Sequence, residues 1–230
     1  MSSEPAKGQT PEELQQIYGH RFDDAELAAK ARLWQTLCEA YFQQFVPATG
    51  TVLDLGSGSC EFVNAIQART KIAVDLNPDT ARFADPEVDV LTTASTDLSG
   101  VKGGSVDTVF TSNFFEHLAS STELLATLAE CRRVLAPQGR IVVLMPNIRN
   151  LGGAYWDYLD HSLALTHVSL TEALELSGFA VEKVIPKFLP YTVKNQKLPP
   201  NPTLVRAYLR LPVVWRLLGK QMLVIARPAA

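Results

Sequence analysis

Apolar runs and amphipathic stretches alternate along the middle of the chain. Five short apolar runs with high β propensity lie at residues 51–55, 71–75, 88–91, 106–111 and 140–145. Helical patterns separate them at residues 60–68, 78–83 and 121–135. Strands that alternate with helices are typical of a parallel sheet that is covered by helices on both sides. The pattern therefore predicts an α/β fold built on a doubly wound sheet.

The regions before this alternation have a different character. Residues 1–10 are polar and are predicted to form a disordered tail, whereas residues 11–18 and 24–45 carry helical patterns. With 230 residues, 47% of them hydrophobic, the chain has the size of one α/β domain with a full core. We therefore expect a single domain over residues 11–230 that begins with helices over residues 11–46.

Cysteine spacing and hydropathy argue against several classes of protein. Cys38, Cys60 and Cys131 lie far apart and in no ligand spacing, so neither a disulfide framework nor a zinc site is predicted. No apolar run reaches the roughly 18 residues of a membrane-spanning helix, and the first residues lack the apolar segment of a secretory signal. We therefore expect a cytoplasmic protein.

Charge is distributed unevenly. Nine of the 21 Lys and Arg residues, and none of the 24 Asp and Glu residues, lie at or after Lys183. Residues 189–220 are rich in proline, and residues 204–220 interleave Arg with Leu, Val and Trp around Pro212, which predicts two short helices. Such a segment fits a peripheral contact with the inner face of an anionic membrane, a clamp for a phosphate-bearing acceptor, or a solvated basic face.

A glycine-containing turn follows the first predicted strand in TVLDLGSGSC, residues 51–60. Gly56 and Gly58 allow the backbone to approach a ligand closely. Asp75 ends the next strand, where a carboxylate can accept hydrogen bonds from both hydroxyls of a ribose. The turn is therefore predicted to hold a nucleoside.

The residues around the glycines narrow the kind of nucleoside. A dinucleotide fingerprint needs a third glycine where Glu61 stands, and the Walker sequence G-K-[ST] is absent. Asp54 and Glu61 would instead favour a ligand that has a cation and an amino group but no phosphate. S-adenosylmethionine is such a ligand.

Four segments occur in order between residues 51 and 178: VLDLGSGS, AVDLNPD, SVDTVFTSNFFEHL and RVLAPQGRIVVLMPN. Together they resemble the motifs of class I S-adenosylmethionine-dependent methyltransferases of the small-molecule type 11 kind. The resemblance implies a Rossmann-like, seven-stranded, mostly parallel sheet, with its core over residues 51–188 and an antiparallel last strand. Residues 179–188 and 221–227 fit the sixth and seventh strands, after a helix over residues 169–176.

The resemblance also implies cofactor contacts at matching positions. Asp54 is expected near the methionine amino group, Asp75 at the ribose and Leu76 beside the adenine. Residues 94–98 match the segment that reads the adenine edge. The remaining cofactor-binding positions that the family implies are Gly56, Ser57, Gly58, Ser95, Thr96, Asp97 and Asn113, the last facing the methyl donor.

A candidate base follows the fourth strand. Methyl transfer depends mainly on the alignment of donor and acceptor in a dry site, but a hydroxyl acceptor must also lose its proton. His117 is the candidate general base because an imidazole titrates near neutral pH, and its neighbour Glu116 is the second candidate catalytic residue. A structural role for His117 at the start of a helix is the alternative.

A metal site is the other possibility at this position. Some relatives, in ubiquinone synthesis and at small-RNA ends, carry E-x-x-E-H with a later His and bind a divalent metal there. This chain has Asn113 in place of the first Glu. Glu116, His117 and His167 could still form a site of one carboxylate and two imidazoles, but His161 and His167 fit structural hydrogen bonds equally well. We therefore predict no metal.

Residues 150–161 follow the fifth strand at the expected active-site edge. Two glycines allow a hinge, and Tyr155 and Trp156 could stack on an acceptor ring. Together with His161 and His167 they are the predicted acceptor-binding residues. An aromatic cluster that packs this segment onto the core is the alternative.

The acceptor is predicted from a looser resemblance. The sequence DHSLALTH, followed by a basic, proline-rich end, is similar to bacterial methyltransferases that accompany glycosyltransferases in cell-surface glycan synthesis. We therefore predict O-methylation of a sugar or of a phosphate-bearing glycan precursor. The alternatives are another small-molecule acceptor, such as a quinone or a natural product, and a non-catalytic protein that binds S-adenosylmethionine. Nucleic acid is not expected as a partner.

Overall fold

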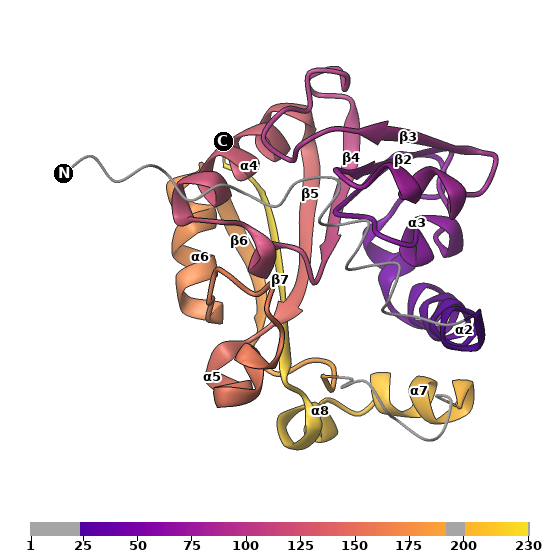
Figure 1. The fold of residues 1–230 in the computed structure, drawn as a ribbon, viewed down its shortest axis with the longest axis vertical. Coiled ribbons are helices and arrows are strands. Elements are labelled where there is room, and N and C mark those ends of the chain that lie inside the picture. Colours follow the sequence, from indigo (N-terminus) through magenta and orange to yellow (C-terminus); the bar gives the residue numbers. More distant parts are fainter. Residues whose placement is uncertain (1–23, 192–200, 230) are drawn as a thin grey trace.

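The computed structural model describes residues 24–191 and 201–229. A seven-stranded sheet forms the centre of the molecule, with strand order β3-β2-β1-β4-β5-β7-β6 (Figure 1). The strands are β1 (Thr51–Leu55), β2 (Thr70–Asp75), β3 (Val88–Thr92), β4 (Val106–Ser112), β5 (Leu135–Pro146), β6 (Phe179–Ile185) and β7 (Gln221–Pro228). β1 to β5 pair parallel with one another, whereas β7 pairs antiparallel with both β5 and β6. The predicted fold class is confirmed.

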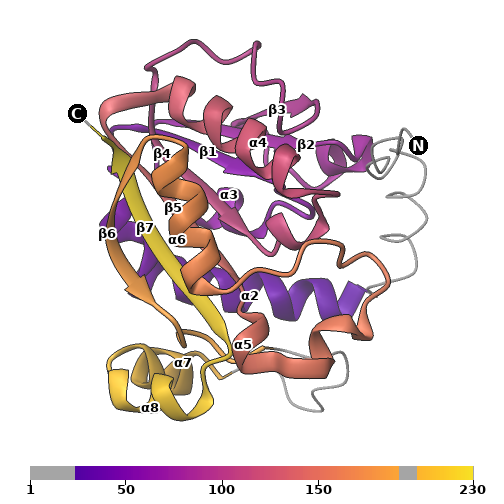
Figure 2. The same ribbon diagram turned by 90° about the vertical axis from the view of Figure 1, so that its left-hand side faces the viewer.

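Helices cover both faces of the sheet (Figure 2). The α-helices are α2 (Asp24–Ala40), α3 (Glu61–Ala65), α4 (Ser121–Val134), α5 (Ile148–Leu151), α6 (His167–Leu176), α7 (Pro202–Leu209) and α8 (Pro212–Leu218). Short 3-10 helices are η1 (Phe42–Phe45), η2 (Pro78–Arg82), η3 (Phe115–His117) and η4 (Gly152–Asp157). Apolar residues of α4 and α6 pack into one core, and those of α2, η1, α7 and α8 into the other. The sheet is therefore a middle layer between two cores.

The predicted elements differ from the structure mainly at their ends. The strand expected over residues 179–188 ends at Ile185, because the next residue is proline, which cannot donate to a sheet ladder. The helix expected over residues 24–45 ends at Ala40, and a separate 3-10 turn follows. The two short helices around Pro212 are confirmed. The tail over residues 1–10 and the helix over residues 11–18 lie outside the described residues.

The strand order reverses between β1 and β4, which places a crevice at the carboxyl ends of these two strands. The turn after β1 passes through Gly56, whose φ is +70°. A Cβ atom at Gly56 would lie 2.4 Å from Cγ of Phe114, which follows β4. The turn and the Phe114 ring are therefore in contact, and only glycine fits at this point.

Substitution of Gly56 by Ala is expected to destabilise the protein more than the same change at Gly104. Gly104 has a similar φ of +69° but open space around it, so Gly104→Ala should cost about 1 kcal/mol for backbone strain alone. Gly56→Ala adds a clash with Phe114, at an additional cost of about 1–3 kcal/mol. Urea unfolding of both variants measures the difference. Equal losses, or no recovery when Phe114→Ala is added to Gly56→Ala, would contradict the contact.

Candidate functional site

A small hollow lies at the carboxyl ends of the central strands, with a volume of about 100 Å³. Its walls are formed by Leu55, Gly56, Val74, Asp75, Leu76, Thr93, Ala94, Ser95, Asn113, Phe114, His117, Leu118, Glu123 and Asp160. A larger hollow of about 810 Å³ lies between α2, α3 and η2, on helices rather than at the strand ends. We assign the smaller hollow as the candidate site because the glycine turn, Asp75 and His117 converge there.

Asp75 connects the two loops on one side of this cavity. One carboxylate oxygen accepts a hydrogen bond from the backbone N–H of Gly58 at 2.7 Å, and the other accepts one from Asn77 at 2.8 Å. Burial raises the pKa of Asp75, and these backbone donors oppose the rise. A carboxylate oxygen can accept a second hydrogen bond, so each can still receive a ligand hydroxyl.

The region beneath the turn carries a concentration of negative charge. Asp54 is buried in β1, and burial followed by the nearby charges of Glu61 and Asp75 raises its pKa well above the usual range. A backbone hydrogen bond from Val63 opposes this rise. Lys30 pairs with Glu61 at 2.9 Å. A cationic or amino-bearing ligand would relieve this repulsion.

The segment after β3 reaches the cavity through different residues from those expected. Ser95 lines the cavity as predicted, although its hydroxyl lies 2.7 Å from the Thr127 hydroxyl. Thr96 and Asp97 are exposed and do not line the cavity, and the Asp97 carboxylate accepts a hydrogen bond from the backbone of Ser99. Their predicted role as cofactor contacts is therefore not supported, and Thr93 and Ala94 take their place at the wall.

Two residues after β4 shape the cavity. Asn113 adopts a left-handed conformation with φ of +50°, which Asn tolerates better than most side chains, and it lines the cavity as predicted. Phe114 was not predicted from the sequence. Its contact with Gly56 depends on the left-handed turn at Asn113, which a sequence pattern does not reveal.

His117 lies at the cavity wall and is held by Asp160. Its Nδ1 lies 3.0 Å from the Asp160 carbonyl oxygen and 3.4 Å from a carboxylate oxygen of the same residue. A carbonyl oxygen only accepts, so the neutral ring carries its proton on Nδ1 and has a lone pair on Nε2. His117 is therefore arranged to accept a proton or to bind a cation. The sequence does not indicate that Asp160 contacts His117, because the two residues are 43 positions apart and Asp160 lies in an irregular segment.

Glu116 lies behind the cavity wall rather than in it. Its side chain is buried, and burial raises its pKa to about 7. The Oε2 atom has no hydrogen-bond partner among the described residues. Its backbone carbonyl accepts hydrogen bonds from Ser162 and Leu163, which brings the segment after residue 157 back to η3.

The predicted acceptor-binding residues separate into two kinds. Tyr155 is fully buried, and its hydroxyl donates to the Leu163 carbonyl, so the expectation that its ring stacks on an acceptor is wrong. His161 is also buried, and its Nδ1 lies 2.7 Å from the Tyr155 carbonyl. Trp156 is 54% exposed and is available to a ligand. His167 begins α6, where its Nδ1 lies 3.1 Å from the Asn147 side-chain nitrogen.

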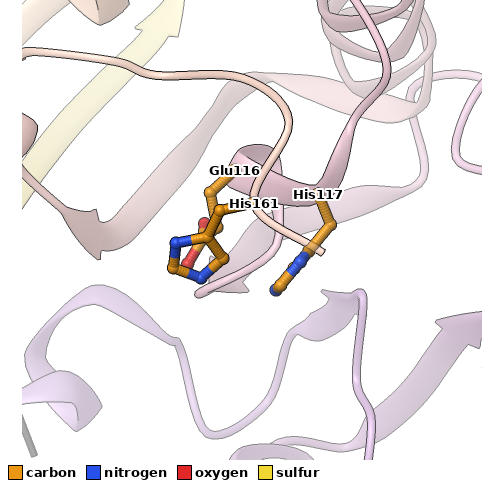
Figure 3. A group of neighbouring side chains, drawn as sticks. All are labelled: Glu116, His117 and His161. Carbon is orange, nitrogen blue, oxygen red and sulfur yellow. The ribbon is translucent and has the colours of Figure 1, made fainter. Parts of the chain in front are cut away.

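Within residues 24–191 and 201–229, three neighbouring side chains could hold a metal: Glu116, His117 and His161 (Figure 3). One ligand atom from each lies within 4.8 Å of the others. Both imidazoles approach a backbone carbonyl oxygen through Nδ1, an arrangement that is common among metal-bound histidines. His167, the histidine considered from the sequence, is not in this group, because α6 begins six residues beyond His161.

Replacement of Glu116 by Gln tests its protonation. The unfolded chain ionises Glu116 near pH 4.5, whereas the folded chain retains the proton up to about pH 7, so burial of Glu116 costs the wild-type protein stability as pH rises through this range. The free energy of unfolding of Glu116→Gln should therefore increase by about 3 kcal/mol relative to that of the wild type as the pH rises through this range. Urea unfolding at about pH 5 and about pH 8, with a chelator present, measures the change. An equal difference at both pH values would contradict the raised pKa.

Part of the chain matches a known protein family. Residues 53–143 match the methyltransferase domain family. No curated protein matches the chain. Among solved structures, the chain is similar to a protein in the complex between the Haloferax volcanii Trm112 methyltransferase activator and a methyltransferase, with 20% identity, a TM-score of 0.69, and 95% of this chain and 98% of that chain covered.

Two further structures agree. A SAM-dependent methyltransferase from Archaeoglobus fulgidus has 20% identity and a TM-score of 0.64 over 89% of this chain and all of that one. A SAM-dependent methyltransferase from Thermotoga maritima, described as a possible histamine N-methyltransferase, has 16% identity and a TM-score of 0.66 over 93% and 99%. At these identities the likeness establishes the fold. The family match spans the glycine turn and β4, and it supports an S-adenosylmethionine-dependent methyltransferase activity with S-adenosylmethionine as the cofactor.

Proposed function

We propose that the protein transfers a methyl group to a hydroxyl oxygen of a sugar or of a phosphate-bearing glycan precursor, in the cytoplasm. The observation that carries the proposal is the position of His117, which lines the same cavity as Asp75 and Asn113 and is held by Asp160. A base at this wall suits an acceptor that must lose a proton during transfer, as a hydroxyl does.

The groups at this cavity suit the cofactor in their chemistry. The turn at Gly56 leaves no room for a side chain, and Asp75 keeps acceptor capacity for two ribose hydroxyls. The acidic residues Asp54 and Glu61 lie near one another beneath the turn, and a ligand with an amino group and a sulfonium would favour their ionised forms. S-adenosylmethionine supplies, when bound, a methyl group that is already activated for displacement.

The chain's own residues then align the acceptor and take up its proton. The Nε2 atom of His117 accepts the proton that the attacking hydroxyl gives up, so that the ring becomes an imidazolium. The Asp160 carboxylate, 3.4 Å from Nδ1, stabilises that positive charge and fixes the ring. Glu116 and His161 lie behind this pair and support the loop that carries Asp160.

Support for a glycan acceptor comes from Trp156 and from the basic C-terminal region. Trp156 is exposed in the segment that returns to η3, and an indole ring offers an apolar face on which a sugar can stack. The basic C-terminal region would attract a phosphate group on the acceptor. A quinone or another natural product would use the same base and is the alternative acceptor class.

Two substitutions separate cofactor binding from proton transfer. Asp75→Asn should abolish binding of S-adenosylhomocysteine. The amide has only one accepting oxygen, so it cannot accept hydrogen bonds from both loops and from both ribose hydroxyls. His117→Gln should retain that binding while methyl transfer falls about 100-fold, the usual contribution of a general base. Calorimetry and transfer of labelled methyl groups measure the two quantities. Full activity of His117→Gln would exclude the base role, and full binding by Asp75→Asn would exclude the cofactor assignment.

The acceptor class is tested with methyl-labelled S-adenosylmethionine and a bacterial extract, fractionated into lipid, polysaccharide, small molecules, RNA and protein. Label is expected in the lipid or polysaccharide fraction and should disappear with His117→Gln. Label confined to another fraction would contradict the glycan acceptor. Tight cofactor binding without transfer would favour the non-catalytic alternative, or a need for an activator protein such as the one in the Haloferax volcanii complex.

The group of Glu116, His117 and His161 supports a second candidate, metal-assisted transfer to a hydroxyl. In that case the cation, rather than Nε2 of His117, would lower the pKa of the acceptor hydroxyl. The specific observation is that Oε2 of the buried Glu116 has no hydrogen-bond partner among the described residues, in a side chain that lies beside His161 (Figure 3).

Metal binding is tested without relying on activity. If the site holds a divalent cation, Mn²⁺ or Zn²⁺ should raise the Tm of the chelator-treated protein, and Glu116→Gln and His161→Gln should each remove the shift. The metal-free mechanism predicts no such shift and full activity in the presence of a chelator.

A further inference from the structure

The α7–α8 pair exposes an unusual concentration of apolar side chains. Five large hydrophobic residues in fifteen positions are 53–78% exposed: Leu204, Leu211, Val213, Leu217 and Leu218. Val213 and Leu217 are four positions apart in α8 and therefore lie on one face of that helix. No described helix is both long and apolar enough to cross a membrane.

The exposed side chains sit on a firmly anchored support. Leu209 and Trp215 are buried in the core of the molecule. The indole N–H of Trp215 donates to the Tyr208 carbonyl at 2.8 Å, and the Tyr208 hydroxyl donates to the Phe188 carbonyl at 2.6 Å. Because these inward contacts fix both helices, Val213 and Leu217 point to solvent as part of the folded structure.

Positive charge is interleaved with these apolar positions. Arg206 pairs with Glu39 of α2 at 2.9 Å, which ties α7 to the body of the protein. Arg210, Arg216 and Lys220 are exposed, and within the described part of the chain none of the three makes an ion pair with an acidic side chain. No acidic residue follows Glu182 in the sequence. The surface therefore complements an anionic partner that also accepts apolar groups.

This surface lies near the carboxyl end of β5. Figures 1 and 2 place α5, α7 and α8 at the same end of the molecule. The backbone N–H of Asn147 donates to the Lys220 carbonyl at 3.1 Å, and the Asn150 side chain donates to the Pro186 carbonyl at 2.7 Å. The segment that follows α5 adds the exposed side chains of Trp156 and Leu159.

We propose that α7 and α8 dock the protein onto an anionic lipid bilayer. Val213, Leu217 and their apolar neighbours enter the boundary between headgroups and acyl chains, while Arg210, Arg216 and Lys220 contact the lipid phosphates. The combination favours a lipid surface because its apolar and anionic parts are continuous and adapt to a convex helix pair. The inference goes beyond methyl transfer, since it concerns where the enzyme works and stands whatever acceptor it uses.

Sedimentation with vesicles tests the apolar part of the surface. Wild-type protein is expected to bind mixed phosphatidylglycerol and phosphatidylcholine vesicles, and to bind pure phosphatidylcholine vesicles much less. Val213→Ser with Leu217→Ser should weaken binding about tenfold or more, because two apolar side chains no longer enter the bilayer. The matched control is Val168→Ser with Leu176→Ser on α6, where a valine and a leucine are also exposed and no loss is expected.

A second pair of variants tests the charges. Arg210→Gln with Arg216→Gln should reduce binding to the anionic vesicles and its sensitivity to salt, whereas Arg69→Gln with Arg82→Gln, two exposed arginines elsewhere, should not. Folding of each variant is checked by thermal unfolding.

Three results would overturn the proposal. They are failure of the wild-type protein to bind anionic vesicles, equal losses in test and control pairs, and a dimer in sedimentation velocity that Val213→Ser with Leu217→Ser dissociates, since a second copy of the chain would then cover the surface. Binding of S-adenosylhomocysteine is measured in parallel, so a failure here is distinguishable from a failure of the enzyme assignment.

Discussion

The carboxylate of Asp75 accepts backbone hydrogen bonds from Gly58 and Asn77, and the cofactor side of the site depends on this interaction. The two donors belong to different loops, one after β1 and one after β2. A single side chain at the end of β2 therefore fixes both loops at the point where the sheet order reverses. Asp75 is half-buried, and its oxygens keep capacity for further donors, so the group that organises the loops also faces the ligand.

Unfavourable features cluster around the same cavity. Carboxyl groups repel one another at Asp54 and Asp75, and Glu116 is held largely protonated near neutral pH by burial. Asn113, which lines the cavity, adopts a left-handed backbone conformation although it is not a glycine. Such costs persist in folded proteins mostly where function requires them. They are consistent with a site arranged for a cationic ligand and for proton transfer rather than for stability.

The extent to which the sequence predicts the structure depends on whether the signal is local. The strands and the two helices at Pro212 follow from apolar runs, glycine and proline, which act on their immediate neighbours. The pairing of His117 with Asp160 does not, because it arises when an irregular segment returns to η3 through hydrogen bonds to the Glu116 carbonyl. For the same reason His161, rather than His167, joins Glu116, and Tyr155 turns inward. Periodicity carries no information about such a loop.

The most direct test of the central claim is a crystal structure of the protein with S-adenosylhomocysteine. We expect the ribose hydroxyls to lie within hydrogen-bonding distance of Asp75 while the bonds from Gly58 and Asn77 are retained, and the sulfur atom to face the wall formed by Asn113 and His117. A nucleoside found in the larger hollow between α2 and α3, or one that does not touch Asp75, would contradict this expectation.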